Sequence, residues 1–190
     1  MFKDTCEWAL SSPKMKIYHD TQWGHPEHDD RELFAMLCLE GAQAGLSWST
    51  IHEREENYRA AFDGFDPAVV AGYEQEKIEE LLQNPGIIRN RLKVQSAVTN
   101  AKAFLKVQEE FGSFDNYIWG FTGGKVIDNH PKEFSDIPAE TELSRTISKD
   151  LKKRGFKFVG ATIIYAYMQS IGMVNDHMEY CHCRKYRKSF

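Results

Sequence analysis

The sequence predicts an all-α protein, a single helical domain over residues 1–190. Three observations support this fold class: apolar residues recur at helical spacing, capping residues and prolines stand where those patterns begin, and strand-like patterns are few. The 42% hydrophobic and 27% charged residues are ordinary for a globular chain, and the length is sufficient to bury a core.

The first expected helix covers residues 29–44. Asp29 and Asp30 are candidate N-caps, and the apolar residues that follow recur at intervals of three and four. A second helix is expected after Ser49 and continues through Phe62. The sequence therefore predicts two successive helices before residue 66.

Similar signals define the later elements. Asp66-Pro67 begins a further helix, since proline suits the first helical position, and Pro85-Gly86 interrupts the chain. Residues 123–138 are rich in glycine and proline and mark a loop before the last two helices. The expected helices of this part span residues 67–71, 74–82, 89–110, 142–153 and 161–171.

Composition also limits the location and the partners. Residues 1–10 contain charged residues and no apolar run, so no secretory signal is expected, and no stretch is apolar enough for a membrane span. We therefore expect a cytoplasmic protein. A monomer is expected as well. The net charge of −4 disfavours bulk attraction to nucleic acid, but local basic clusters can reverse this. These clusters are Lys149, Lys152, Lys153, Arg154 and Lys157, and in the tail Arg184, Lys185, Arg187 and Lys188.

The cysteines and histidines near the two chain ends suggest a metal site, because disulfides are rare in the cytosol. Cys6 precedes His19, and His177 and Cys181 are four residues apart, which would place both donors on one helix face. Two nitrogens and two thiolates would complete a tetrahedral zinc shell with no open position, so the zinc would be structural. A reduced thiol cluster without metal is the alternative. The competing ligands are His182 and Cys183.

Residues 142–172 form an expected helix-hairpin-helix element. The turn from Gly155 to Gly160 has a glycine at each end, where backbone N–H groups can approach a phosphate closely. Lys153, Arg154 and Lys157 would surround that phosphate, and such contacts position a protein on DNA without reading its sequence. A plain turn between two helices is the alternative.

Glu40 is the most informative acidic residue. It shares a helix face with Leu33 and Leu37, so its carboxylate is expected to be partly buried. Buried carboxylates are unfavourable unless they are paired, and they tend to mark functional sites. A solvated helix end is the alternative for Glu40.

Aromatic residues form a second set of candidates for a binding pocket. Trp48 follows a run of small residues and offers a flat face for stacking on a base. Trp8, Tyr18 and Trp23 suit a planar, electron-poor ligand near a carboxylate. Core packing is the alternative for each of these rings.

Five motifs occur in order along the chain, and together they cover nearly all of it. They are Cys6-x-Trp8, Tyr18-His19-Asp20-x-x-Trp23-Gly24, Leu39-Glu40-Gly41-x-Gln43-Ala44-Gly45-Leu46-Ser47-Trp48, Lys152-Lys153-Arg154-Gly155-Phe156-Lys157-Phe158-Val159-Gly160, and Val174-Asn175-Asp176-His177. With these motifs the sequence resembles the DNA-3-methyladenine glycosylase I family, a branch of the helix-hairpin-helix glycosylases.

The resemblance implies a helix-hairpin-helix glycosylase-like fold and an activity in base excision repair. The protein would flip 3-methyladenine out of alkylated double-stranded DNA and hydrolyse its N-glycosidic bond, leaving an abasic site. No lysine nucleophile is evident, so a monofunctional enzyme is expected. A structural zinc would join residues 6–19 to residues 177–181. Its implied ligands are Cys6, His19, His177 and Cys181.

The resemblance also assigns roles to residues. Glu40 and Tyr18 would be catalytic, and both would contact the base together with Trp8 and Trp48. Leu46 would be the wedge that enters the duplex at the lesion. The implied DNA contacts are Gln43, Gly45, Leu46, Lys153, Lys157, Phe158 and Gly160.

The chemistry leaves some choices open. The methylated base carries its own positive charge and leaves readily, so an ionised Glu40 is the hypothesised selector of the lesion. Asp176 could stabilise the sugar cation, or it could orient the zinc ligands instead. The alternative functions are a zinc-stabilised DNA-binding module without activity and an enzyme that acts on a small molecule.

Overall fold

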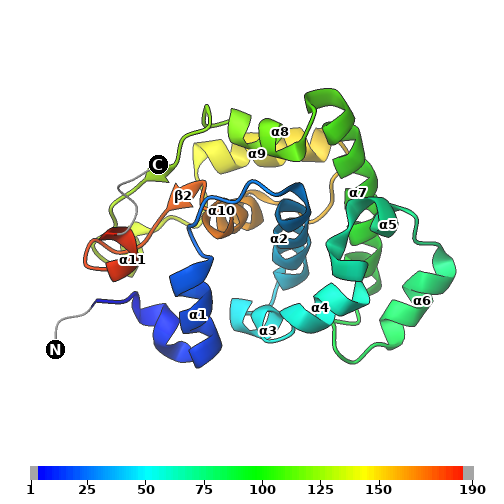
Figure 1. The fold of residues 1–190 in the computed structure, drawn as a ribbon, viewed down its shortest axis with the longest axis horizontal. Coiled ribbons are helices and arrows are strands. Elements are labelled where there is room, and N and C mark those ends of the chain that lie inside the picture. The colour runs from blue at the N-terminus through cyan, green and yellow to red at the C-terminus, as the bar shows by residue number, and fades with distance from the viewer. Residues whose placement is uncertain (1–3, 186–190) are drawn as a thin grey trace.

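The computed structural model describes residues 4–185, except for the side chains of Trp48 and Lys185. Most of these residues are helical (Figure 1), so a mostly helical protein is confirmed. Two basic residues of the tail, Arg187 and Lys188, lie outside the described residues. None of the helices within residues 4–185 combines the length and the apolar character that crossing a membrane requires.

The helices follow the expected order with several corrections. In the first part of the chain they are α1 (Pro13–Thr21), α2 (Asp30–Gln43), α3 (Trp48–His52), α4 (Glu55–Ala61), α5 (Pro67–Ala71) and α6 (Gln75–Gln83). In the second part they are α7 (Arg91–Phe111), α8 (Phe114–Gly120), α9 (Glu142–Lys153), α10 (Ala161–Ser170) and α11 (His182–Lys185). Short 3-10 turns lie at Glu7–Ser11, Asp63–Phe65 and Phe134–Asp136.

Capping explains the helices that the sequence predicts best. The Asp29 side chain accepts hydrogen bonds from the backbone N–H groups of Arg31 and Glu32, at 2.9 and 3.0 Å, and so starts α2. Thr141 and Ser144 form a reciprocal capping box at the start of α9. These helices begin within one residue of the expected positions.

The single helix expected from Ser49 to Phe62 is wrong, because the chain forms α3 and α4 there. The break lies at Arg54, whose guanidinium donates a 3.2 Å hydrogen bond to the Thr50 carbonyl. The Arg54 backbone N–H bonds instead to the Ile51 carbonyl, which ends the helix in a tighter turn. The side chain thus occupies the carbonyl that a continuing helix would use.

One small sheet is an exception to the all-α expectation. Strand β1 (Ile127–Asp128) pairs in parallel with β2 (Val174–Asn175), in the register Ile127 to Val174. Two residues in each strand are too few to give a sequence pattern. The pairing holds the loop after α8 against the C-terminal segment.

Helix α2 runs through the centre of the molecule (Figure 1) and contacts α3, α7, α8 and α10. Its apolar residues, among them Leu33, Phe34 and Leu37, belong to the main core cluster. Helices α1 and α11 lie at one end of the molecule, and α5 and α6 lie at the other. The C-terminal turn of α2 therefore brings Glu40 and Gln43 from the core to the edge of a cavity.

Candidate functional site

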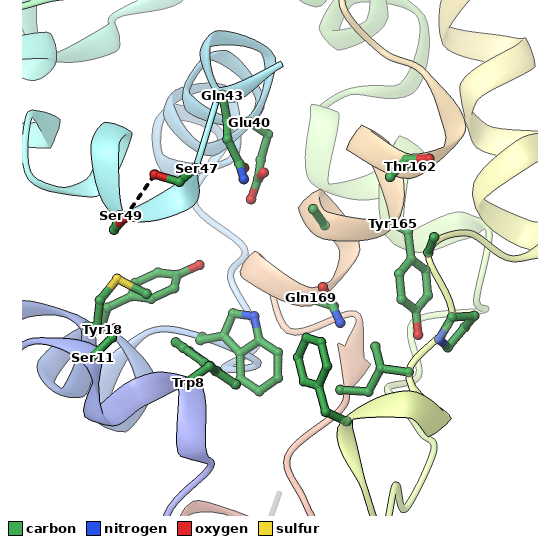
Figure 2. Close-up of a pocket in the computed structure, with 17 residues that line it drawn as sticks. Trp8, Ser11, Tyr18, Glu40, Gln43, Ser47, Ser49, Thr162, Tyr165 and Gln169 are labelled. Atoms are coloured by element: carbon green, nitrogen blue, oxygen red, sulfur yellow. Dashed lines mark hydrogen bonds between the residues drawn. The ribbon is translucent and has the colours of Figure 1, made fainter. Parts of the chain in front are cut away.

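A cavity of about 650 Å³ lies between α1, the end of α2, α10 and the segment 134–139. Figure 2 shows Glu40 and Gln43 entering it from α2, with Trp8 and Tyr18 on the opposite side. Four of the residues that the sequence assigns to the site therefore line one cavity. Helix α10 forms a third side, through Tyr165 and other residues.

The Glu40 carboxyl is the only acidic group among the described residues that line this cavity. Glu40 is 3% exposed, and burial raises the pKa of its carboxyl to about 8. A hydrogen bond with Ser170 opposes this rise in the pKa but does not offset it. Glu40 is therefore mainly protonated at pH 7, and the expectation of a buried carboxyl is confirmed.

Aromatic rings form the wall opposite Glu40. The Trp8 ring lies edge-on to Trp23 at 4.9 Å and tilted to Tyr18 at 6.4 Å between ring centroids. Tyr18 is 2% exposed, and burial, together with the charges of Glu40 and Glu55, holds the pKa of its phenol well above the ordinary value of 10.0. Its hydroxyl stays protonated and can donate a hydrogen bond at any physiological pH.

The chain turns sharply where α2 ends. Gly45 has a φ of +77°, a conformation that favours glycine, and the Leu46 N–H bonds to the Gln43 carbonyl at 2.6 Å. Leu46 is 39% exposed at this turn, beside Ser47, which caps α3 and lines the cavity. The Trp48 side chain lies outside the described part, so its stacking role stays a prediction.

The α10 wall contains polar residues that the sequence did not single out. Asp176 accepts hydrogen bonds from Tyr165 (2.6 Å), Gln169 (2.8 Å) and Asn129 (2.8 Å). Tyr165 and Gln169 are four residues apart on α10, and both line the cavity (Figure 2). Asp176 is 1% exposed and occupied by these donors, so it organises the cavity wall. The i, i+4 spacing of Tyr165 and Gln169 on an expected helix was the sequence signal that could have identified them.

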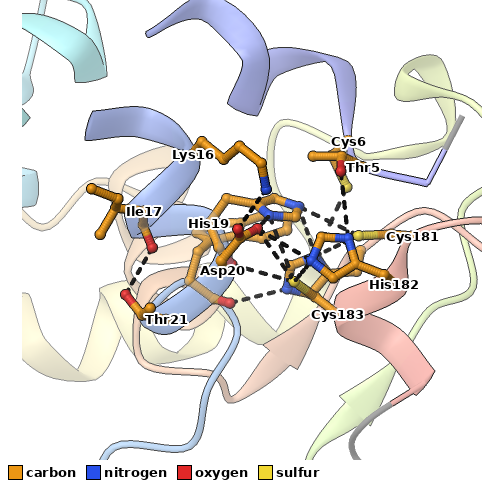
Figure 3. Close-up of polar contacts among 12 residues, drawn as sticks. Thr5, Cys6, Lys16, Ile17, His19, Asp20, Thr21, Cys181, His182 and Cys183 are labelled. Carbon is orange, nitrogen blue, oxygen red and sulfur yellow. Dashed lines mark hydrogen bonds and ion pairs between the residues drawn. The ribbon is translucent and has the colours of Figure 1, made fainter. Parts of the chain in front are cut away.

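The four donors expected to bind metal come together at one end of the molecule. The potential ligand atoms of Cys6, His19, His177 and Cys181 all lie within 4.8 Å of one another, and all four residues are buried. We call these four residues the clasp. Figure 3 shows part of it, with Cys6 and Cys181 close to His19.

The hydrogen bonds of the two histidine rings direct a lone pair of each into the clasp. His19 Nδ1 donates to the Asp20 carboxylate at 2.8 Å, and His177 Nε2 donates to the Trp23 carbonyl at 3.1 Å. His19 Nε2 and His177 Nδ1 are therefore both unprotonated in the neutral rings, and they lie 3.2 Å apart. Two lone pairs at this distance repel each other unless a proton or a metal ion lies between them.

The distances within the clasp fit a tetrahedral ion. Zinc bonds of about 2.0–2.1 Å to nitrogen and about 2.3 Å to sulfur give ligand–ligand edges of roughly 3.3–3.8 Å. Cys181 Sγ lies 3.4 Å from His19 Nε2 and 3.5 Å from His177 Nδ1, and Cys6 Sγ lies 3.8 Å from His177 Nδ1. The clasp residues can thus hold a metal ion in a closed shell.

Two features of the clasp differ from expectation. His177 and Cys181 do not share a helix face, because residues 176–181 form a loop and turn after β2. Cys183 and His182 lie outside the four-donor shell: Cys183 Sγ approaches His19 from its Nδ1 side, at 3.7 Å. The competing ligands form other candidate groups, Cys181 with His182 and Cys183, and Cys183 with His19 and Asp20.

The segment between α9 and α10 is a tight turn on the surface. Gly155 and Phe158 have φ values of +96° and +54°, and the side chains of Phe156 and Val159 are buried beneath the turn. Lys153 and Lys157 are exposed, and neither forms an ion pair with another described residue. Gly160 precedes α10 without a side chain to cap it, which leaves its first N–H groups open to an anion.

Arg154 does not join these lysines, which corrects the expectation that it surrounds a phosphate. Its guanidinium bonds to Asp150 at 2.7 Å and to Glu110 at 2.7 and 3.2 Å, and it lies over the rings of Phe111 and Tyr117. Arg154 therefore fastens α9 to α7 and α8, and the exposed positive charge of the turn comes from lysines.

Comparison with known proteins places this arrangement in a family. Residues 8–185 match the family model described as methyladenine glycosylase. The chain is 46% identical over 180 residues to DNA-3-methyladenine glycosylase 1 of Escherichia coli (strain K12), and the match covers 95% of this chain and 96% of that protein.

Solved structures give the same result. A crystal structure of 3-methyladenine DNA glycosylase I has a TM-score of 0.91 at 48% identity, covering 95% of this chain and 99% of the other. A structure that addresses 3-methyladenine recognition by the Staphylococcus aureus enzyme has a TM-score of 0.92 at 33% identity, covering 96% and 97%. This chain therefore belongs to the methyladenine glycosylase family.

Proposed function

We propose that this protein is a DNA-3-methyladenine glycosylase of base excision repair. It removes 3-methyladenine from alkylated double-stranded DNA and leaves an abasic site. The observation that carries the proposal is the buried Glu40 carboxyl, which faces Trp8 and Tyr18 across a cavity. Membership of the methyladenine glycosylase family and similarity to proteins named for this activity support it.

The reaction breaks the bond between N9 of the base and C1′ of the sugar, and water supplies the hydroxyl of the abasic product. Methylation at N3 makes the purine a cation and thereby a good leaving group. Its departure does not require protonation by the protein. The cavity must bind and orient a planar cation, which aromatic faces do by cation–π attraction.

Glu40 selects the lesion by charge. Burial keeps Glu40 mainly protonated in the free protein, and a cationic base in the cavity drives its ionisation. The carboxylate then accepts a hydrogen bond from the amino edge of the base. Normal adenine is neutral and gives no such stabilisation, and Tyr18 contributes a neutral hydroxyl on the opposite side.

The exposed turns around the cavity hold the duplex. Leu46 enters the base stack where the lesion leaves it, with Gln43 and Gly45 near the gap. The turn between α9 and α10 is the hairpin that binds phosphate through Lys153, Lys157, the backbone of Phe158 and the open end of α10 at Gly160. The exposure of Leu46 and of both lysines supports these roles.

The clasp binds a structural zinc ion. When bound, the ion supplies a crosslink between the N- and C-terminal segments, and four protein ligands leave no place for water or substrate. Trp8 follows Cys6 by two residues, and Tyr18 precedes His19, so the clasp also fixes two rings of the aromatic wall of the cavity. None of the described residues that line the cavity is a lysine, which supports a monofunctional enzyme.

A duplex containing one radiolabelled 3-methyladenine tests this function. Release of the free base, with an alkali-sensitive abasic site left in the strand, is expected. Binding to the duplex without release would indicate a DNA-binding module instead. Neither binding nor release would indicate an enzyme that acts on a small molecule.

A further inference from the structure

Two separate elements must contact DNA together if the proposed function is correct, and this inference rests on that function. One is the turn at residues 43–46, which follows α2, and the other is the hairpin at residues 154–160. They come from distant parts of the sequence. Both are fastened by side chains of a third element, helix α7.

Lys93 holds the first of these elements. Its Nζ donates hydrogen bonds of 2.7 Å to the carbonyls of both Ala42 and Ala44. The last carbonyls of a helix have no partner within the helix and attract a cation. Lys93 therefore caps α2 from outside and fixes the start of the turn that presents Leu46. Partial burial lowers the pKa of Lys93.

Asn100 holds the second element. Asn100 is 3% exposed, and its side chain forms two hydrogen bonds with the backbone of Lys157. Asn100 Nδ2 donates to the Lys157 carbonyl at 3.0 Å, and Asn100 Oδ1 accepts from the Lys157 N–H at 2.7 Å. The backbone at the tip of the hairpin is thus held by two hydrogen bonds to α7.

The spacing of Lys93 and Asn100 fixes the distance between the two elements. Seven residues are about two helical turns, so both side chains lie on one face, about 10 Å apart along the axis. A third contact joins the last turn of α2, just before residues 43–46, to the hairpin, because a Cβ on Gly41 would lie 3.3 Å from the Phe158 Cβ. The turn at residues 43–46, which we call the wedge turn, and the hairpin are therefore both held in place by α7.

We propose that Lys93 and Asn100 are positioning residues that set the wedge turn in register with the phosphate-binding hairpin. When the hairpin holds a phosphate, this register determines where Leu46 meets the base stack. The hydrogen bonds of Lys93 go to Ala42 and Ala44, which are not among the residues that line the cavity, so its effect falls on base flipping rather than on base binding.

The test compares Lys93→Met with Lys102→Met. Both variants remove one lysine charge from α7, and Lys102 is exposed without an ion pair to another described residue. Single-turnover release of 3-methyladenine is measured from a duplex and from the same strand unpaired. Thermal unfolding and binding of the free base are measured on each protein.

Lys93→Met should slow release from the duplex by roughly 10- to 100-fold, since misplacement by about 1 Å commonly costs that much in rate. Release from the single strand and binding of the free base should stay within about 2-fold, because a single strand needs no wedge. Lys102→Met should behave as wild type. Lys93→Arg, which keeps a positive charge and N–H donors at the C-terminus of α2, should restore most of the duplex rate.

Equal losses on both substrates, or an unchanged duplex rate, would overturn the role of Lys93. Should Lys93→Met not fold, Lys93→Gln provides a shorter donor with the same expected split between substrates. Asn100→Ala should weaken binding to undamaged duplex. Unchanged binding would overturn the positioning role of Asn100. If the wild-type protein releases no base from either substrate, the proposed function itself fails, which is a different result from these.

Discussion

The role proposed for Glu40 makes the recognition of a cationic lesion depend on pH. Burial raises the pKa of Glu40 to about 8, and the ionised form is the one proposed to bind the cation. The methylated base has a fixed charge, and Tyr18, whose pKa lies well above 10.0, stays neutral in this range. Below pH 8 each unit of decrease in pH should therefore reduce kcat/KM by up to tenfold.

The magnitude follows from the ionised fraction. With a pKa of about 8, roughly 1% of Glu40 is ionised at pH 6, about 10% at pH 7 and half at pH 8, so kcat/KM should rise roughly 50-fold from pH 6 to pH 8. At pH 7 the ionisation costs about 1.4 kcal/mol, which binding of the cation must exceed.

The assay is release of labelled 3-methyladenine from alkylated duplex at substrate concentrations below KM, at constant ionic strength. Glu40→Gln is the control, since its amide does not titrate, and its low rate should not vary with pH. A wild-type profile that is flat between pH 6 and pH 8, or one that falls, would refute the assignment of Glu40 as an ionising selector.

Three further predictions concern stability, the metal and DNA binding. Because folding raises the pKa of Glu40 from 4.5 to about 8, the free energy of unfolding falls as pH rises between those values. In urea unfolding at pH 7, Glu40→Gln should therefore be more stable than wild type by about 3 kcal/mol. A gain in stability that persists undiminished at pH 4.5 would contradict this. Removing the proposed zinc with a chelator should lower the free energy of unfolding by about 4 kcal/mol, relative to protein at a zinc concentration of about 1,000 times Kd. It should also weaken base binding, because Trp8 and Tyr18 lie beside clasp residues in the sequence. An unchanged melting temperature in metal-free protein would show that the clasp needs no ion. Lys157→Ala should reduce the slope of log K against log salt by about one for duplex binding, with Lys102→Met as the matched control, and an unchanged slope would remove Lys157 from the phosphate contacts.

Local signals predict the helices that bear the site. Asp29 and Thr141 each cap a helix whose apolar residues recur with the helical period, so α2 and α9 follow from the sequence. Helix α1 was missed although Ser12-Pro13 is such a signal, with Ser12 accepting from the Met15 N–H. Glu40 was found because its position on an apolar helix face implies burial.

Tertiary contacts explain what the sequence could not predict. Asp176 reaches Asn129, which lies 47 residues earlier, through the pairing of β1 with β2, and no local pattern reports that neighbour. The hydrogen bonds of Asp176 are with Asn129 and with two residues of the cavity wall, and its two open roles stay predictions. Arg154 was misjudged for the same reason, because Glu110 lies 44 residues away.

The clasp contains both kinds of feature, those that the sequence predicts and those that depend on tertiary contacts. Spacing alone left His182 and Cys183 as rivals, and a helix from His177 to Cys181 was the wrong reason for a correct proximity. The hydrogen bonds from His19 to Asp20 and from His177 to Trp23 decide which nitrogens face inward. Such orientation depends on the folded structure.

The most direct test of the central claim is single-turnover release of base from a duplex with one 3-methyladenine at pH 8, for wild type and Glu40→Gln side by side. Wild type should release 3-methyladenine and leave an abasic site. The variant should fold and bind the duplex but release base roughly 100-fold more slowly, the loss typical of removing one electrostatic group from an active site. Release by the variant at the wild-type rate would contradict the claim that Glu40 selects the lesion within this cavity.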